Sequence, residues 1–144
     1  MDDLTVVAAS IIFLIAGYDT TATTLAFVLY ELAKNPDIQE RLRAEIEEVT
    51  NGDLEKEWTY DDLQTLTYLD QVLNETMRMH HPIGILMRKT TKDYKMPGTD
   101  LIVPKGIGLW IPLQAILLDE NHYANAHVFD PDRFSKDAKA KRNP

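Results

Sequence analysis

The chain of 144 residues contains no cysteine, which excludes disulfides, zinc sites with cysteine ligands and thiol nucleophiles within it. Positive charge is also scarce, because 15 lysine and arginine residues face 23 aspartate and glutamate residues and the net charge is −8. Nucleic-acid phosphates bind basic surfaces, so this balance argues against a nucleic-acid partner. The four histidines are not spaced as ligand pairs one helical turn apart, and no metal site is predicted.

Proline is absent between Asp3 and Lys34, and Gly17 is the only glycine in that apolar stretch. The lack of helix breakers predicts one long central helix over residues 3–34, ended by Asn35-Pro36, because a residue before proline avoids the α region. At about 1.5 Å per residue this helix would be roughly 45–50 Å long. A helix that is apolar on most faces is expected to be surrounded by protein. We therefore expect the chain to be a segment of a larger protein.

The same stretch favours a core helix over a membrane-spanning one. Its uninterrupted apolar part ends at Gly17 and is shorter than the roughly 20 residues that a span requires. Asp19 and several threonines follow, and no lysine or arginine precedes the stretch to set an orientation. The acidic start at Met1-Asp2-Asp3 also differs from the basic start of a secretory signal.

A glycine and several polar side chains interrupt the middle of this helix, in the order Ala16-Gly17-Tyr18-Asp19-Thr20-Thr21. Glycine inside a helix costs roughly 1 kcal/mol relative to alanine. A carboxylate among buried aliphatic side chains costs more unless it is partnered. We expect a sequence that accepts both at one place to position a ligand there, with a proton relay beside it.

The rest of the chain predicts a helical segment over residues 36–82 and a β-hairpin and irregular segment over residues 83–144. Asn35 and Thr59 are predicted to cap the helices that follow them. Another helix is predicted from about residue 68 to residue 80. Beyond residue 83 the period changes, and the strand at 107–111 is expected to pair with the strand at 101–103 across a turn. The fold class is therefore mainly α with a small antiparallel β-sheet.

Four charged side chains have more than one interpretation from local pattern. Glu75 and Arg78 share a helix face, where a surface ion pair contributes only a few tenths of a kcal/mol. Arg88 lies in an apolar extended segment, and Arg133 follows Asp130-Pro131-Asp132. Each of these two arginines either reaches to water or meets a buried anion that fits its planar fork.

Taken together and in this order, the motifs resemble the cytochrome P450 monooxygenase family. Residues 16–21 resemble the oxygen-activation motif of the family's long central helix, residues 75–78 its Glu-x-x-Arg motif, and residues 130–134 its Pro-x-Arg-Phe element. The sequence is most similar to the microsomal, xenobiotic-metabolising members, particularly those of insects. The resemblance implies a partial cytochrome P450 fold in which residues 1–144 are an internal fragment of a single catalytic domain.

The resemblance also implies roles for individual residues around a haem. Ala16 and Gly17 would let the haem face approach the helix backbone. Thr20 would contact both cofactor and oxygen, and Asp19 would help to relay protons. Arg88 would bind a haem propionate through charge-assisted hydrogen bonds.

Two further groups of residues follow from the same resemblance. Glu75, Arg78 and Arg133 would form a buried network that supports the haem domain without taking part in chemistry. The substrate pocket would be lined by Ile12, Phe13, Ala16, Ile85 and Leu86.

The family's iron ligand is a cysteine thiolate, which is expected beyond Pro144, so no metal ligand is predicted in this chain. The full-length protein would be a haem-thiolate monooxygenase that uses O2, an apolar small-molecule substrate and electrons from NADPH through a reductase. It would be anchored by an N-terminal segment to the cytosolic face of the endoplasmic reticulum membrane, and this fragment alone would be inactive. Two alternatives remain open: a non-catalytic haem-protein relative or pseudogene product that keeps the scaffold, and a helical interaction module without a cofactor.

Overall fold

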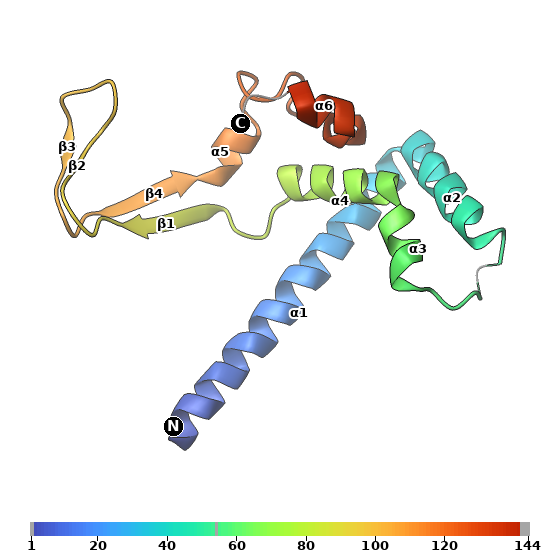
Figure 1. Cartoon of the computed structure of the whole chain (residues 1–144), viewed down its shortest axis with the longest axis horizontal. Helices are drawn as coiled ribbons and strands as arrows, with labels where there is room; N and C mark the ends of the chain where they lie inside the picture. The colour runs from blue at the N-terminus through green and yellow to red at the C-terminus, as the bar shows by residue number, and fades with distance from the viewer. Residues whose placement is uncertain (1, 54, 142–144) are drawn as a thin grey trace. The chain divides into compact units, whose positions relative to one another are not determined.

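The computed structural model describes residues 2–53 and 55–141 and consists mainly of helices with short antiparallel strands (Figure 1). This confirms the predicted fold class. The chain divides into two compact units, one of Met1–Pro82 together with His127–Pro144 and the other of Ile83–Ala126. The last part of the predicted 83–144 segment therefore belongs with the helices.

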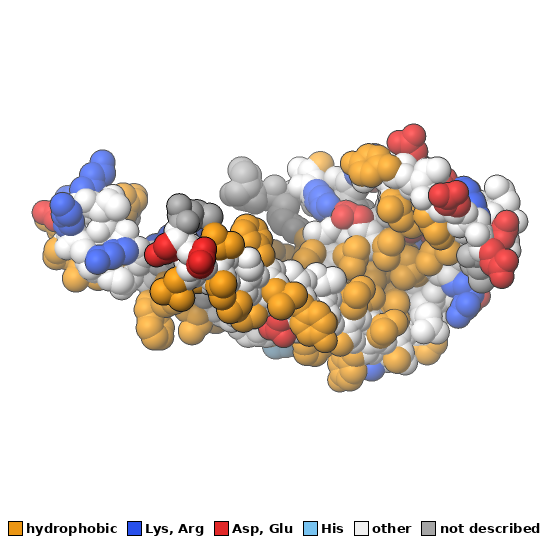
Figure 2. All heavy atoms as spheres, turned by 90° about the horizontal axis from the view of Figure 1, so that it is seen from below, with side chains coloured by type: hydrophobic (Ala, Val, Ile, Leu, Met, Phe, Trp, Pro, Cys, Tyr) orange, Lys and Arg blue, Asp and Glu red, His pale blue; other side chains and the backbone are white. Residues whose placement is uncertain are grey.

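Helix α1 runs from Asp3 to Lys34, and the Asp2 carboxylate caps it by accepting a hydrogen bond from the Thr5 N–H at 2.9 Å. Its buried side chains all lie near its C-terminal end, at Val28, Glu31 and Leu32. The large apolar residues of its first half are exposed, and Figure 2 shows hydrophobic groups over much of the surface in view. By length and composition α1 could cross a membrane, but a long core helix of a soluble protein meets the same criteria.

Helix α2 runs from Pro36 to Thr50 and ends at Asn51, which has a left-handed φ of 53°. The prediction that Asn35 caps α2 is wrong, since its side chain makes no capping bond there. Its amide instead donates to the Glu31 carbonyl oxygen of α1 at 2.8 Å. This bond, with a longer one from the same amide to the Glu31 carboxylate, directs the side chain to the end of α1, where the last carbonyl groups have no helical partners.

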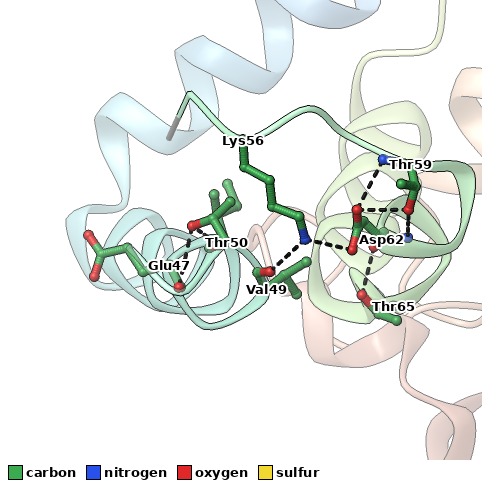
Figure 3. Close-up of polar contacts among 8 residues, drawn as sticks. Glu47, Val49, Thr50, Lys56, Thr59, Asp62 and Thr65 are labelled. Carbon is green, nitrogen blue, oxygen red and sulfur yellow. Dashed lines mark hydrogen bonds and ion pairs between the residues drawn. The ribbon is translucent and has the colours of Figure 1, made fainter. Parts of the chain in front are cut away.

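Helix α3 runs from Tyr60 to Thr65 and begins with the predicted cap, in which Thr59 and Asp62 exchange hydrogen bonds as a capping box. Lys56 joins this cap to α2, because its ammonium group lies 2.9 Å from Asp62 Oδ1 and 3.2 Å from the Val49 carbonyl oxygen (Figure 3). The lysine thereby connects the last turn of α2 to the first turn of α3.

Helix α4 runs from Thr67 to Met79, and its N-terminus is capped from another helix. Glu45 of α2 accepts hydrogen bonds from the backbone N–H groups of Tyr68 and Leu69, at 2.7 and 2.9 Å. A carboxylate at this end also complements the positive end of the helix dipole. The hydrophobic core formed where these helices meet contains Val28, Leu32, Leu42, Tyr68, Val72 and Phe129.

Two pairs of strands make up the sheet region of the second unit. Strand β1 (Ile85–Lys89) pairs with β4 (Gly108–Pro112), and β2 (Tyr94–Lys95) pairs with β3 (Ile102–Val103), all antiparallel. The predicted pairing of 107–111 with 101–103 is therefore wrong, and β1 is the partner instead. The physical reason lies at Thr90, whose hydroxyl donates to the Pro104 carbonyl oxygen and accepts from the Ile107 N–H, so the turn is bound to the end of β1.

Three short helices complete the described chain. Helix α5 (Leu113–Leu117) follows β4, the 3-10 helix η1 (Pro131–Phe134) contains the Pro-Asp-Arg-Phe element, and α6 spans Lys136–Lys141. Residues 142–144, the end of the predicted irregular segment, lie outside the described residues. The element that matters most for the candidate site is η1, because it brings Arg133 against α4.

Candidate functional site

The middle of α1 presents a continuous stripe of small and apolar residues. At 3.6 residues per turn, Phe13, Gly17 and Thr20 lie on the same face of the helix. Phe13, on this face, is 80% exposed, and Ile12 and Ala16, which flank the face, are exposed as well. A Cβ added to Gly17 would meet no atom within 4 Å outside the helix's own backbone and the flanking residues. The stripe can therefore receive a flat group directly against the helix backbone.

Thr20 supplies the hydroxyl group on this stripe. Its Oγ1 donates to the Ala16 carbonyl oxygen at 2.7 Å, the usual i−4 bond of a helical threonine. The oxygen keeps lone pairs for a further hydrogen bond. Asp19 is exposed and lies about 100° around the helix from Thr20, so its carboxylate is beside the stripe and not on it.

Three predicted residues meet at a buried ionic network between α4 and η1. Glu75 is 0% exposed, and its two oxygens accept from Arg78 Nε at 2.7 Å and Nη2 at 2.8 Å. Arg133 Nε donates to the same carboxylate at 3.3 Å, and the Asp130 N–H adds a bond of 3.0 Å. The interpretation of Glu75 and Arg78 as a surface pair is therefore wrong. The reason is that η1 covers this face of α4. The three-residue spacing of Glu75 and Arg78 in the sequence does not show what covers them.

A second ionic contact holds η1 in place. Arg41 of α2 makes two parallel hydrogen bonds to the Asp132 carboxylate, at 2.8 and 2.9 Å. Its guanidinium also lies 3.9 Å from the centre of the Tyr68 ring, a cation–π distance. The hydrogen bond to Asp132 raises the pKa of Arg41. Because Asp132 and Arg133 are neighbours, this contact helps to fix the backbone from which Arg133 reaches Glu75.

The remaining predicted residues belong to the second unit, on β1. Ile85 and Leu86 are neighbours on a strand and so point to opposite faces of the sheet. Leu86 shares its face with Arg88, whereas Ile85 shares its face with Met87. The Arg88 side chain is exposed, and it donates to the Met87 carbonyl oxygen at 2.9 Å. Several of its donors thus remain available for an anion.

One cluster in the first unit was missed by the sequence interpretation. The ring of His80, at the end of α4, contacts three side chains of α1, which we call the His80 clamp: Phe27, Tyr30 and Glu31. Asp19 and Glu31 are the only acidic residues of α1 beyond its first turn. The presence of Glu31 among aliphatic residues was a usable signal, but it does not identify the partner.

No group of three or more histidine, aspartate and glutamate side chains within residues 2–53 and 55–141 could hold a metal ion. The described residues offer an exposed face of α1 that carries threonine hydroxyl groups and, separately, a buried ionic network between α4 and η1.

Comparison with known proteins places the chain among related sequences. The family model described as cytochrome P450 matches residues 1–144. The chain is 44% identical to "Probable cytochrome P450 6a14" of Drosophila melanogaster over 137 residues, which is 95% of this chain and 27% of that protein. It is 40% identical to "Cytochrome P450 6B6" of Helicoverpa armigera over 142 residues, covering 99% of this chain and 28% of that protein. The chain thus spans about a quarter of the length of these relatives.

Proposed function

The chain belongs to the cytochrome P450 family, and we propose that it is part of the catalytic domain of a haem-thiolate monooxygenase. The complete protein would insert one atom of O2 into an apolar small molecule, with electrons from NADPH supplied through a reductase. Its location would be the endoplasmic reticulum membrane, facing the cytosol. This chain has no cysteine, so the thiolate ligand would come from another part of the protein, and the chain alone would be inactive.

The observation that carries the proposal is the open stripe on α1 beside the Thr20 hydroxyl. Its side chains are apolar or small, and Gly17 leaves the backbone uncovered. These properties fit the face of a flat macrocycle. The exposed guanidinium of Arg88 fits a propionate in charge and geometry, because its fork matches a carboxylate. Each of these groups is suited by itself to one part of haem, which would supply the oxygen-activating chemistry when bound.

In this proposal the side chains of α1 exclude water and move a proton. Ile12, Phe13 and Ala16 would form an apolar wall against the substrate. Because Ile85 and Leu86 point to opposite faces of β1, only one of these two side chains would line a single pocket. The Thr20 Oγ1 would accept a hydrogen bond while its own proton stays hydrogen-bonded to the Ala16 carbonyl oxygen, and it would donate one only after releasing that carbonyl group. The exposed position of Asp19 suits a group that exchanges protons with solvent and passes them toward that hydroxyl.

The proposal is tested by Thr20→Ala in the full-length holoenzyme. We expect the coupling ratio, defined as product formed per NADPH consumed, to fall by at least about an order of magnitude, because a positioned proton-transfer group contributes roughly 10²–10⁴-fold to the rate of its step. Haem content should stay unchanged, because Thr20 bonds only within its own helix in the described structure. Thr20→Ser, which keeps the hydroxyl, is the matched control and should retain coupling.

Equal coupling in Thr20→Ala and the wild type would contradict the role of this hydroxyl. The two alternatives give different results in the same preparations. A non-catalytic relative would bind haem and form no product, and a cofactor-free interaction module would bind no haem when haem is titrated into the full-length protein.

A further inference from the structure

The His80 clamp gives the imidazole of α4 a defined position against α1. His80 Nε2 lies 2.7 Å from Glu31 Oε1. The Phe27 ring stacks on the imidazole with a centroid distance of 4.3 Å and an interplanar angle of 1°. The Tyr30 ring meets it edge-on at 6.1 Å. Three side chains of α1 therefore contact the imidazole ring of His80 at the end of α4.

Glu31 depends on this contact because it is almost fully removed from water, at 1% exposure. Its other side-chain contacts are longer: Lys34 Nζ is 3.6 Å away and half-exposed, and Asn35 Nδ2 is 3.4 Å away. The short contact to His80 is the one with the length of a charge-assisted hydrogen bond. Removing it would leave a buried carboxylate without its main donor, which is unfavourable.

The clamp and the Thr20 hydroxyl share one face of α1. Eleven residues separate Thr20 from Glu31, which is about three helical turns and leaves the two side chains only about 20° apart around the axis. Thr24 and Phe27 lie between them on the same stripe. In a straight helix, the rotation about the helix axis that points Glu31 toward His80 therefore also fixes the direction in which the Thr20 side chain points.

Core packing also resists this rotation, because Val28 and Leu32 of α1 lie in the hydrophobic core. The other buried residues of α1 are Val28 and Leu32, whose apolar contacts are not directional. A hydrogen bond of 2.7 Å and a parallel ring stack are directional, and a rotation of α1 would break both. The clamp thus adds a directional constraint to the rotation that the core packing allows.

We propose that Glu31 and His80 are positioning residues that set the rotation of α1 and so orient Thr20 toward the reacting oxygen. The proposal rests on the proposed monooxygenase function. The residues act at a distance, so they affect how well the hydroxyl is placed and not whether it is present. Misplacement of a reacting group by about 1 Å is enough to lower a rate strongly.

The test uses four variants of the full-length holoenzyme. Glu31→Leu and His80→Phe remove the hydrogen bond from either side, and His80→Phe retains an aromatic ring for the stack. Glu31→Gln keeps an acceptor for the His80 N–H. Lys34→Gln removes a longer contact to the same carboxylate and is the matched control. Two quantities are measured: coupling per bound haem, and hydrogen–deuterium exchange of the amides in residues 16–24.

We expect Glu31→Leu and His80→Phe to lower coupling several-fold and to speed exchange in residues 16–24, whereas Glu31→Gln and Lys34→Gln keep wild-type values. Wild-type coupling in either of the first two variants would overturn the proposal. If neither assembles as holoenzyme and exchange rises across α4 as well as α1, the pair is only stabilising and the proposal also fails. If Thr20→Ala itself couples normally, the proposed function fails first, and the clamp then has no hydroxyl to orient.

Discussion

At the scale of single residues, burial decides what an ion pair contributes. Glu75–Arg78 and Glu40–Arg43 are both glutamate–arginine pairs three residues apart on a helix, with closest contacts of 2.7 and 3.5 Å. The side chains of the first pair are at most 1% exposed, whereas those of the second are more than half exposed. An exposed pair contributes little, but breaking a buried one leaves an uncompensated charge.

Arg78→Leu should therefore prevent haem incorporation in the full-length protein, with a loss of folding stability of about 3–5 kcal/mol. Glu75 would keep Arg133 and the Asp130 N–H but lose its shortest partners. The measurement is haem content of purified protein together with its chemical unfolding. Arg43→Leu is the matched control and should leave both unchanged. Normal haem binding by Arg78→Leu would show that the network is not required.

Asp62 gives a prediction for pH. The hydrogen bond from Lys56, with those from the Thr59 N–H and hydroxyl, lowers the pKa of Asp62 from 3.8 to about 2. A lowered pKa in the folded state stabilises the fold above the unfolded pKa, and this stabilisation is lost as the pH falls through the folded value. Near neutral pH, the Asp62→Asn variant should therefore have a lower thermal midpoint of unfolding than the wild type. The difference between the two midpoints should shrink as the pH falls from about 4 to about 2. Asp61→Asn, on the same turn, is the control; a constant difference across this range would refute the assignment.

At the scale of elements, one helix N-terminus is capped by residues next to it in the sequence and another by a residue of a different helix. The N-terminus of α3 is capped by Thr59 and Asp62 from its own sequence, and the cap at Thr59 was predicted from the sequence. The N-terminus of α4 has Leu66 at its cap position, which offers no side-chain bond, and Glu45 takes that role from α2. Glu45 is more than twenty residues away, so local pattern cannot identify it.

Glu45→Ala should destabilise the packing of α4 on α2 by about 1 kcal/mol, the usual cost of a lost N-cap. We expect faster hydrogen exchange at the amides of residues 67–71, because the Tyr68 and Leu69 N–H groups lose their acceptor. Glu48→Ala removes an exposed carboxylate from the same helix and should leave exchange at these amides unchanged. Unchanged exchange in Glu45→Ala would mean that water replaces the carboxylate fully.

At the scale of the whole chain, the main unfavourable feature is the first half of α1, whose large apolar residues are exposed to water. Most of the large hydrophobic side chains from Leu4 to Tyr18 are more than two-fifths exposed. Contiguous apolar surface of this kind marks an interaction site or an aggregation hazard. The relatives that the chain matches are about four times as long, since it covers 27% and 28% of them.

The chain of 144 residues on its own should therefore bind a hydrophobic dye strongly and associate as its concentration rises. Phe13→Lys, at a position that is 80% exposed, should reduce dye binding without loss of helical circular dichroism. Val72→Lys, at a fully buried position, should instead unfold the helical core. An absence of dye binding in the wild-type chain, with a particle mass of one copy, would contradict an exposed apolar face.

The sequence by itself determined the elements whose causes are local. The lack of proline up to Asn35-Pro36 set the extent of α1, the Thr59–Asp62 box set the start of α3, and the motif around Gly17 marked the face of α1 that we assign to the ligand. Tertiary structure decided which distant groups meet: Glu75 with Arg133, Glu45 with α4, Glu31 with His80, and β1 with β4. The physical reason is that capping and periodicity are encoded within a few residues. Burial and long-range hydrogen bonds depend instead on which surfaces pack together.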